Sequence, residues 1–341
     1  MGSRCNSGRR VGTGEGVRRG SDRLCAVRIC ILDDVERVAL DSADWASLEA
    51  DEVVALDRHV ADADELVTLL APFDVVVAQR ERTPLPRAVI ERLPGLRLLV
   101  TTGVRNAAID LAACADHGIT VCNTGGGGNP VVELAWALLL AAVRDVPDRV
   151  TSMRAGEWQP TAGRTVEGLV LGLLGLGRTG TRMARIGQAF GMDVVAWSEN
   201  LTAEAAAEHG VRRVTKHDLF ETSDVVSVHT VLSDRTRGIV GEPELRAMRP
   251  DAWLVNTSRG PVCDENAVVR ACREGWIAGA ALDVFDVEPL PADHVLRTLP
   301  NVLLTPHVGY VTRENLRSWF GAVVEDVAAY AAGTPIRTLT T

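Results

Sequence analysis

A glycine-rich turn between an apolar strand and a helix constrains this chain more than any other stretch. Residues 170–174, VLGLL, form a short apolar run, and glycines follow at Gly175, Gly177 and Gly180. The residues after them, TRMARIGQAF, have helical spacing. In such a unit the first glycine makes the turn, the second lets backbone approach a pyrophosphate, and the third lets the helix pack on the strand. The pattern predicts a dinucleotide site, and a glycine turn without a ligand is the alternative.

The chain of 341 residues is long enough for two domains, each with its own core. Residues 1–24 are rich in Gly, Ser and Arg and contain almost nothing apolar. Such a segment cannot bury enough surface to offset its ordering entropy, so we predict a disordered tail. A targeting peptide is the alternative, but the segment lacks an apolar core and a clear amphipathic face.

Strand-like and helical runs alternate after this tail. Strand-like runs lie at 27–32, 52–56, 74–78, 96–101 and 119–121, and helical stretches such as 61–70 and 87–93 separate them. This alternation predicts parallel crossovers and a doubly wound α/β domain. The loops 80–83 and 102–106 follow strand ends, where open α/β sheets bind ligands. Arg80 and Arg105 in these loops are either ligand-binding residues or solvated surface charges.

The stretch NTGGGGNP at 123–130 interrupts the alternation and indicates a hinge followed by a helix. Asn129 suits the N-cap and Pro130 the first helical position. The helix that follows, VVELAWALLLAAVRDV, is apolar on nearly every face, which is typical of a buried helix. Burial inside one chain and burial against a second subunit both fit, and we favour the second subunit.

Strands of the nucleotide domain follow at 192–197, 224–229, 253–256, 277–282 and 302–304. In a parallel sheet their carboxyl ends share the edge that faces the cofactor, so Arg259, Glu288 and His307 are expected to converge. A guanidinium binds a carboxylate bidentately, and an imidazole moves a proton near neutral pH. A carboxylate beside the imidazole fixes its orientation and favours its protonated form.

The residues that bind the ribose of the cofactor are expected directly after the second strand of this domain. Dinucleotide sites place Asp or Glu roughly 20 residues after the first glycine to hold the ribose hydroxyls, whereas an Arg accommodates a 2′-phosphate. Ser198 stands near that point, followed by Glu199 and Asn200, with no adjacent Arg. Glu199 suits the ribose role and would repel a phosphate. The sequence therefore favours NAD, with NADP possible.

Composition argues against several other classes of protein. The net charge of −9 argues against a nucleic-acid surface, which needs clustered Lys and Arg. No apolar run approaches the roughly 20 residues of a membrane helix. The seven cysteines have neither a C-x-x-C pair nor metal-ligand spacing, which predicts reduced thiols in a cytoplasmic protein without a metal site.

Four stretches together carry a resemblance to a known family. They are LGLLGLGRTG at 171–180, HTVLSDRTRGIVGEPELRAMRPDAWLVNTSRG at 229–260, ALDVFDVEPLP at 281–291 and LLTPHVG at 303–309. With them the chain resembles the D-isomer-specific 2-hydroxyacid dehydrogenases over about residues 28–339. The resemblance implies reduction of a 2-keto acid to a D-2-hydroxy acid, or the reverse. It implies Arg259 as the binder of substrate carboxylate and keto oxygen, His307 as acid/base and Glu288 as its partner.

The resemblance also implies a set of binding residues. Asp283 is expected near the nicotinamide carboxamide, and the backbone N–H groups of Gly103 and Val104 are expected to hold the substrate carboxylate. The expected cofactor-binding residues are Gly175, Gly177, Arg178, Thr179, Gly180, Ser198, Glu199, His229, Thr230, Thr257, Ser258, Asp283 and Gly309. The expected substrate-binding residues are Arg80, Gly103, Val104 and Arg105.

The implied fold has two doubly wound, Rossmann-like α/β domains with the active site in the cleft between them. Residues 25–127 and 310–341 are expected to form a flavodoxin-like substrate domain, and 128–309 the NAD-binding domain. A homodimer through the helix at 130–154 and the nucleotide domain is expected.

Departures from the family pattern and rival classes remain open at this point. Ser198 replaces the usual Asp, Val131 and Val132 replace Thr and Ala near the nicotinamide, and Leu316, Trp319 and Phe320 give an unusual aromatic pattern.

A short-chain reductase needs Tyr-x-x-x-Lys, which neither tyrosine begins. A methyltransferase leaves the Arg, Glu and His set unexplained. An NAD-sensing, corepressor-like protein with little turnover is the alternative function. The substrate and the direction of reaction stay undetermined.

Overall fold

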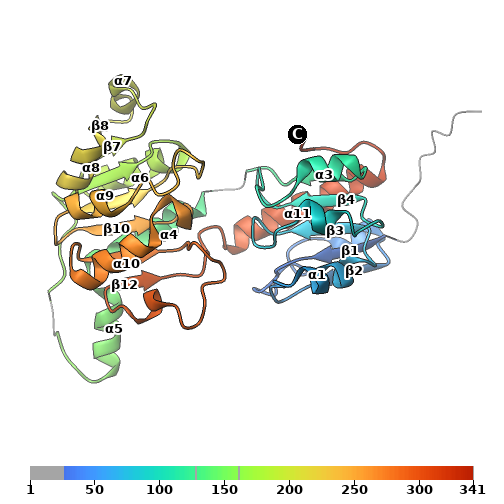
Figure 1. Cartoon of the computed structure of the whole chain (residues 1–341), viewed down its shortest axis with the longest axis horizontal. Helices are drawn as coiled ribbons and strands as arrows, with labels where there is room; N and C mark the ends of the chain where they lie inside the picture. Colours follow the sequence, from blue (N-terminus) through green and yellow to red (C-terminus); the bar gives the residue numbers. More distant parts are fainter. Residues whose placement is uncertain (1–26, 127–128, 160–161, 341) are drawn as a thin grey trace, which may run out of the picture. The chain divides into compact units, whose positions relative to one another are not determined.

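The computed structural model describes residues 27–126, 129–159 and 162–340, so the predicted tail at 1–24 lies outside the described residues. The chain forms two compact units. The first contains the described residues up to Gly126 together with those from Trp319 onwards, and the second runs from 127 to Ser318. Each unit is a parallel sheet with helices on both faces, which confirms the predicted fold class (Figure 1).

The sheet of the first unit has five parallel strands in the order β2-β1-β3-β4-β5. The strands are β1 (Arg28–Ile31), β2 (Glu52–Ala55), β3 (Val75–Ala78), β4 (Leu98–Thr101) and β5 (Thr120–Asn123). Every residue of β3 and β4 is buried. A strand covered on both faces needs a continuous apolar run, which explains the sequences VVVA and LLVT.

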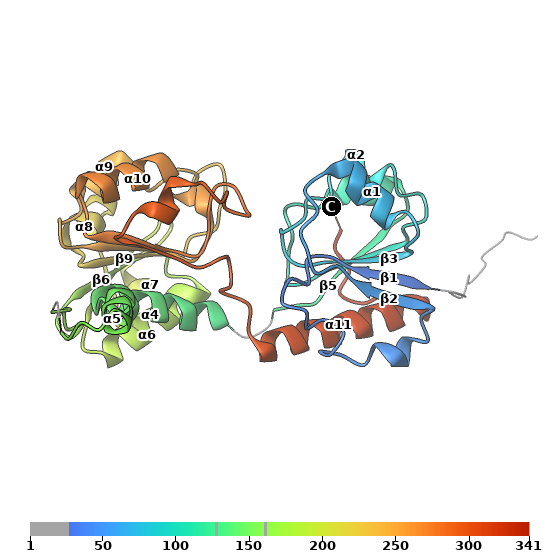
Figure 2. The ribbon, with the colours of Figure 1, turned by 90° about the horizontal axis from the view of Figure 1, so that it is seen from below.

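Helices cover both faces of this sheet (Figure 2). On one face lie α1 (Ala63–Leu70), α2 (Arg87–Ile90) and α3 (Leu111–Asp116). Asp62 caps α1 and Asp110 caps α3, each accepting a backbone N–H three residues on. The other face is covered by the short helix η1 (Trp45–Leu48) and by α11 (Arg313–Ala331), whose Phe320 ring lies 6.1 Å from the Trp45 ring.

The sheet of the second unit has seven strands in the order β12-β11-β10-β9-β6-β7-β8. They are β6 (Val170–Leu174), β7 (Asp193–Trp197), β8 (Arg212–Arg213), β9 (Val225–Val228), β10 (Trp253–Asn256), β11 (Gly279–Leu282) and β12 (Val302–Leu304). All paired strands are parallel. From β6 the chain first builds outward through β7 and β8 and then returns to β9 on the other side. The switch point between β6 and β9 is where such sheets bind ligands.

Helices again lie on both faces of the second sheet (Figure 2). On one face are α8 (Lys216–Thr222), α9 (Glu242–Ala247) and α10 (Glu265–Glu274), and on the other α4 (Pro130–Val143) and α6 (Arg178–Ala189). The remaining elements are α5 (Val146–Arg154), α7 (Ala203–Ala207), η2 (Gly260–Val262) and η3 (Val295–Thr298). Among the described residues no helix combines the length and apolar character needed to cross a membrane.

The apolar helix α4 begins as predicted, with Asn129 at the N-cap and Pro130 in the first turn. Its apolar surface is mostly buried inside the unit, which corrects our preference for burial against a second subunit. Trp136 and Leu139 belong to a cluster with strand residues such as Leu171, and α4 packs on β10, β11 and α6. A helix that packs against both a sheet and a second helix needs apolar residues on more than one side.

A buried ion pair attaches the C-terminal segment to the first unit. Asp326 of α11 is fully buried, and its Oδ1 accepts a hydrogen bond from Arg337 Nε at 3.0 Å. The carbonyl of Arg337 accepts a hydrogen bond from the backbone N–H of Asn123 at the end of β5. Burial raises the pKa of Asp326 to about 7, although Arg337 opposes the rise.

This raised pKa predicts how Asp326 affects stability. The folded chain holds the Asp326 proton more tightly than the unfolded chain, whose pKa is near 3.8, so ionisation costs stability as pH rises from about 4 to about 7. We expect the wild type to lose free energy of unfolding relative to Asp326→Asn over this window. Urea unfolding of both proteins at about pH 5 and about pH 8 measures it. A difference between them that does not change with pH contradicts the assignment.

Candidate active site

The glycine turn after β6 has the close contacts that its sequence pattern predicts. Gly175 has a φ of 103°, and a Cβ on it would lie 2.9 Å from the carbonyl oxygen of His229. A Cβ on Gly180 would lie 2.2 Å from the carbonyl oxygen of Gly175. Neither position accepts a side chain, because backbone atoms occupy the space. The turn therefore holds α6 directly against the end of β6.

Gly177 lies at the N-cap of α6 and provides no side-chain cap. Apart from Gly177 itself and the adjacent backbone, no described atom lies within 4 Å of a Cβ built at Gly177. The N–H groups of the first turn of α6 thus border open space at the positive end of the helix dipole, which suits a pyrophosphate. Arg178 begins the helix in an exposed position, and Thr179 Oγ1 accepts a hydrogen bond from Asn129 Nδ2 at 3.3 Å.

The ends of β9 and β10 lie beside this turn. His229 Nε2 is 2.9 Å from Ser227 Oγ, and burial lowers the pKa of His229 to about 4, so this imidazole is neutral at pH 7. Ser258 Oγ donates to the carbonyl oxygen of Thr230, which joins the two strand ends. Thr257 Oγ1 is buried without a hydrogen-bond partner among the described residues. An unsatisfied hydroxyl at this edge fits a site that a polar ligand completes.

The end of β7 is bound to the same turn, because the N–H of Gly175 donates to the carbonyl oxygen of Trp197 at 2.8 Å. Ser198 and Glu199 follow Trp197, and Glu199 is exposed. The glycine turn, the first turn of α6 and these strand ends make one edge of the second unit. Their donor set fits a dinucleotide.

The second unit also brings His307 and Glu288 together. His307 Nδ1 lies 2.5 Å from Glu288 Oε2, and the other carboxylate oxygen of Glu288 accepts the N–H of Phe285 at 2.8 Å. The Tyr310 ring meets the imidazole edge-on, with centroids 5.7 Å apart. Glu288 thus fixes both the orientation and the tautomer of His307, and Nε2 is the ring nitrogen turned away from the carboxylate.

Asp283 holds the loop that carries His307. Its Oδ1 accepts from Thr305 Oγ1 at 2.6 Å and from the N–H of Val308 at 2.8 Å, and its Oδ2 accepts from the N–H of Gly309 at 2.9 Å. Asp283 is buried, and burial raises its pKa against the opposing effect of these hydrogen bonds and of His307. These contacts give Asp283 a positioning role in addition to the cofactor contact expected from the sequence.

Arg259 follows β10 in a loop that a neighbouring amide and glycine hold in place. Asn256 Nδ2 donates to the carbonyl oxygen of Arg259, and Asn256 Oδ1 accepts the N–H of Ser258, both at 3.0 Å. A Cβ on Gly260 would lie 2.0 Å from the carbonyl carbon of Phe285. The absence of a Cβ therefore lets the Arg259 loop touch the loop that carries Glu288. Sequence reasoning did not assign Asn256 or Gly260 a role, although both lie in the NTSRG stretch.

The first unit places Arg80 and Gly103 in contact. Arg80 has a φ of 54°; Thr102 Oγ1 accepts its N–H at 3.0 Å, and Asn106 Nδ2 donates to its carbonyl oxygen. Its guanidinium lies over the backbone of Gly103, where a Cβ would be 2.1 Å from Arg80 Nη1. The N–H of Gly103 donates to Thr124 Oγ1 at 2.8 Å, which leaves the expected carboxylate contact to its neighbour Val104.

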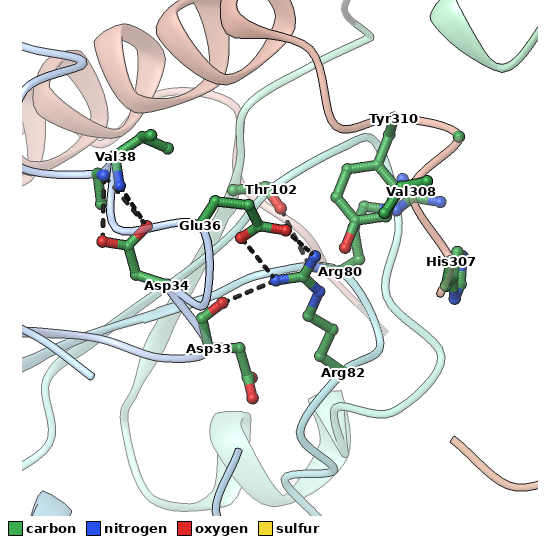
Figure 3. A network of polar contacts seen from close by, with 12 residues as sticks. Asp33, Asp34, Glu36, Val38, Arg80, Arg82, Thr102, His307, Val308 and Tyr310 are labelled. Atoms are coloured by element: carbon green, nitrogen blue, oxygen red, sulfur yellow. Dashed lines mark hydrogen bonds and ion pairs between the residues drawn. The ribbon is translucent and has the colours of Figure 1, made fainter. Parts of the chain in front are cut away.

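A satisfied polar network fixes the loops around Arg80 (Figure 3). Arg82 donates to both carboxylate oxygens of Glu36 and, at 2.7 Å, to the carbonyl oxygen of Asp33. Asp34 accepts the N–H groups of the loop residues Val38 and Ala39. Arg82 thus serves the fold, whereas Arg80 lies beside the 102–106 loop. Val104 is half exposed and Arg105 is exposed in that loop.

Known proteins share these features. The family model of the D-isomer specific 2-hydroxyacid dehydrogenase NAD binding domain matches residues 136–309. A glyoxylate reductase of Aeropyrum pernix is 40% identical over 72% of this chain and 76% of its own length, and one of Thermococcus litoralis is 34% identical over 85% and 87%. The structure of a putative D-3-phosphoglycerate dehydrogenase from Ralstonia solanacearum has a TM-score of 0.87 at 35% identity, covering 92% and 96%.

The chain belongs to the D-isomer-specific 2-hydroxyacid dehydrogenases. As a member of this family it is an NAD(P)-dependent oxidoreductase that interconverts 2-keto acids and D-2-hydroxy acids, so its substrate is a small molecule. The comparisons give no support to the sensor alternative. Within the second unit of this dehydrogenase, His307 meets Glu288 directly, and Gly260 brings the Arg259 loop to the same place.

The close contact at Gly260 leads to a test of this arrangement. Gly260→Ala places a methyl group into the Phe285 backbone, so the Arg259 and Glu288 loops must separate. Because a small displacement of reacting groups is expensive, we expect kcat/KM to fall about 10²-fold while NADH binding, measured by fluorescence titration, persists. Gly321→Ala is the matched control, since outside its own helical turn no described atom lies within 4 Å of its Cβ position. Wild-type kcat/KM in Gly260→Ala contradicts the argument.

Proposed function

We propose that this dehydrogenase reduces a short 2-keto acid with His307 as proton donor and Arg259 as substrate-binding cation. The observation that carries the proposal is the 2.5 Å contact between His307 and Glu288, whose other oxygen is anchored on the Phe285 backbone. A bound reduced nicotinamide supplies the hydride. The relatives suggest the range of substrates, since they are named for glyoxylate and for 3-phosphoglycerate.

Each residue has a role that follows from its chemistry. His307 Nε2 donates a proton to the keto oxygen while Glu288 holds the ring and stabilises its positive charge. The Arg259 guanidinium binds the substrate carboxylate and stabilises the negative charge that develops on the oxygen. In the first unit, the N–H of Val104 binds the carboxylate, with Arg80 and Arg105 as nearby cations. Gly103 contributes by leaving room for Arg80.

The cofactor assignment is NAD rather than NADP. The pyrophosphate is assigned to the turn of Gly175 and Gly177 at the start of α6, and the adenosine ribose to the segment after β7. Glu199 is exposed there, and no arginine follows directly. Its carboxylate suits ribose hydroxyls and repels a 2′-phosphate. The other assigned cofactor contacts come from Arg178, Thr179, Gly180, Ser198, His229, Thr230, Thr257, Ser258, Asp283 and Gly309.

His307→Ala tests the proton-donor role. Loss of a general acid costs roughly 10²- to 10⁴-fold in kcat, so we expect a drop of that size in NADH oxidation with glyoxylate or hydroxypyruvate. NADH binding should persist, because His307 lies outside the glycine turn. His217→Ala is the control, since this side chain is 70% exposed on α8. Full turnover in His307→Ala overturns the role, and tighter binding of NADPH than NADH overturns the cofactor assignment.

We further propose a homodimer formed through α5 and the residues that follow it. None of the residues of α5 is buried, and an apolar surface of Val146, Val150, Met153 and Trp158 is 44%, 42%, 58% and 75% exposed. Arg154 and Glu157 lie on the same surface. A two-fold partner presents the same residues, and the opposite charges of Arg154 and Glu157 make this surface complementary to a second copy of itself. Large exposed apolar surfaces of this kind mark interfaces.

Met153→Glu tests this interface. A carboxylate at the centre of the apolar surface must be buried on association, so we expect sedimentation velocity to detect a dimer for the wild type and a monomer for the variant. Leu40→Glu, which alters a 50% exposed residue of the first unit, should leave the dimer intact. A monomeric wild type contradicts the proposal, as does a dimeric Met153→Glu protein.

We also propose a cytoplasmic location. The described free cysteines are Cys30, Cys114, Cys122, Cys263 and Cys272, and all are buried. Burial raises their pKa values to about 11 or 12, which keeps them as unreactive thiols. Buried reduced thiols are typical of cytosolic proteins.

A further inference from the structure

Gln79, a buried glutamine next to Arg80, has an unsatisfied side-chain amide in the described part of the chain. Gln79 follows the last residue of β3 and is 1% exposed. Its Nε2 and Oε1 are both buried, and neither has a hydrogen-bond partner among the described residues. A buried polar group without a hydrogen-bond partner destabilises the folded state, and the Gln79 amide is unsatisfied at both ends. A residue that lowers stability in this way, at a strand end where such sheets bind ligands, suggests a function.

Strand alternation places Gln79 on a particular face of the sheet. Val76 and Ala78 of β3 belong to the core under α1, α2 and α3, whereas Val75 and Val77 do not. Because side chains alternate along a strand, Gln79 continues the row of Val75 and Val77. That face is covered by α11, which carries Trp319 (Figure 2).

Arg80 reaches the same side and borders solvent. Its guanidinium carbon lies 5.9 Å from the Trp319 ring centroid, and its side chain is 22% exposed. Arg80 Nε forms an ion pair with the Glu81 carboxylate at 3.7 Å. Gln79 directly precedes Arg80 in the chain, so its buried amide lies at the same strand end as Arg80, one of the cations that we placed near the substrate carboxylate.

We propose that Gln79 is a specificity-determining residue that recognises an oxygen on the third carbon of the substrate. The amide offers both a donor and an acceptor, which a hydroxyl group satisfies at once. This inference rests on the proposed function, because it assumes that a 2-keto acid binds beside Arg80. It names the substrate class as 3-oxygenated 2-keto acids, and Arg80 supplies the charge that a phosphorylated oxygen would require.

A pair of substrates that differ by one hydroxyl isolates this contact. Hydroxypyruvate carries the oxygen and pyruvate lacks it, so the ratio of their kcat/KM values measures recognition at the third carbon. A site built to hydrogen-bond a hydroxyl discriminates strongly against the analogue that lacks it. We expect the wild type to prefer hydroxypyruvate and Gln79→Leu to lower the ratio about 10- to 100-fold, mainly by losing hydroxypyruvate activity.

Two further variants keep the test decisive. Gln79→Met retains the length of the side chain without the amide and should lower the ratio in the same way, even if Gln79→Leu folds poorly. Gln188→Leu is the matched control, because Gln188 lies on α6 and donates to the carbonyl oxygens of His209 and Gly210. This control should leave the ratio unchanged. The melting temperature of Gln79→Met should equal or exceed that of the wild type, since an unsatisfied amide is removed.

The possible outcomes distinguish the role of Gln79 from the proposed function, the reduction of a 2-keto acid. Equal kcat/KM for hydroxypyruvate and pyruvate in the wild type, or an unchanged ratio in Gln79→Met, overturns the role of Gln79 and leaves the reductase intact. A wild type that oxidises NADH with none of glyoxylate, pyruvate and hydroxypyruvate overturns the proposed function together with the inference. If 3-phosphohydroxypyruvate is the better substrate, Arg80→Leu should abolish that preference, and Gln79→Met should still reduce it.

Discussion

The carboxylate of Asp283 holds in place the loop on which the proposed chemistry depends. It accepts hydrogen bonds from Thr305, Val308 and Gly309, and His307 lies within this span with a left-handed φ of 53°. A non-glycine residue in that conformation costs of order 1–3 kcal/mol. Charge-assisted hydrogen bonds to a buried carboxylate offset such a cost, since each is stronger than a neutral one. The imidazole is therefore oriented before substrate arrives, and Glu288 only has to complete its alignment.

In the first unit, neutral side chains stabilise a residue with the same left-handed backbone conformation. Arg80 also has a left-handed φ, of 54°, directly after a parallel strand, and Thr102 and Asn106 hold its backbone. In both units the residue proposed to meet the substrate follows a parallel strand and is fixed by side chains from the neighbouring strand end. The surrounding hydrogen bonds hold each residue in this strained conformation.

The sequence predicted those parts of the molecule that follow from local rules. Apolar runs located the strands, and the spacing of Gly175, Gly177 and Gly180 predicted close backbone contacts that the structure contains. Burial of α4 inside its unit was the less favoured of two alternatives, because a helix that is apolar on all sides has the same sequence pattern whether it packs on a sheet or on a second subunit. The bond from the Gly103 N–H to Thr124 was also missed, since it joins residues 21 positions apart. Such pairings depend on strand register, which periodicity does not specify.

Polar groups with hydrogen-bond partners stabilise the loops at the carboxyl ends of the strands, whereas buried polar groups without partners indicate where ligands bind. Arg82, Glu36 and Asp33 form a network in which each charge has partners, so this network stabilises the loops and has no capacity left for a ligand. Within the part of the chain that the structure describes, Thr257 and Gln79 are buried without hydrogen-bond partners, one beside the glycine turn and the other beside Arg80. Folded proteins rarely leave buried polar groups unsatisfied. Two such groups at the carboxyl ends of parallel strands support the two proposals, a cofactor contact at Thr257 and a substrate contact at Gln79.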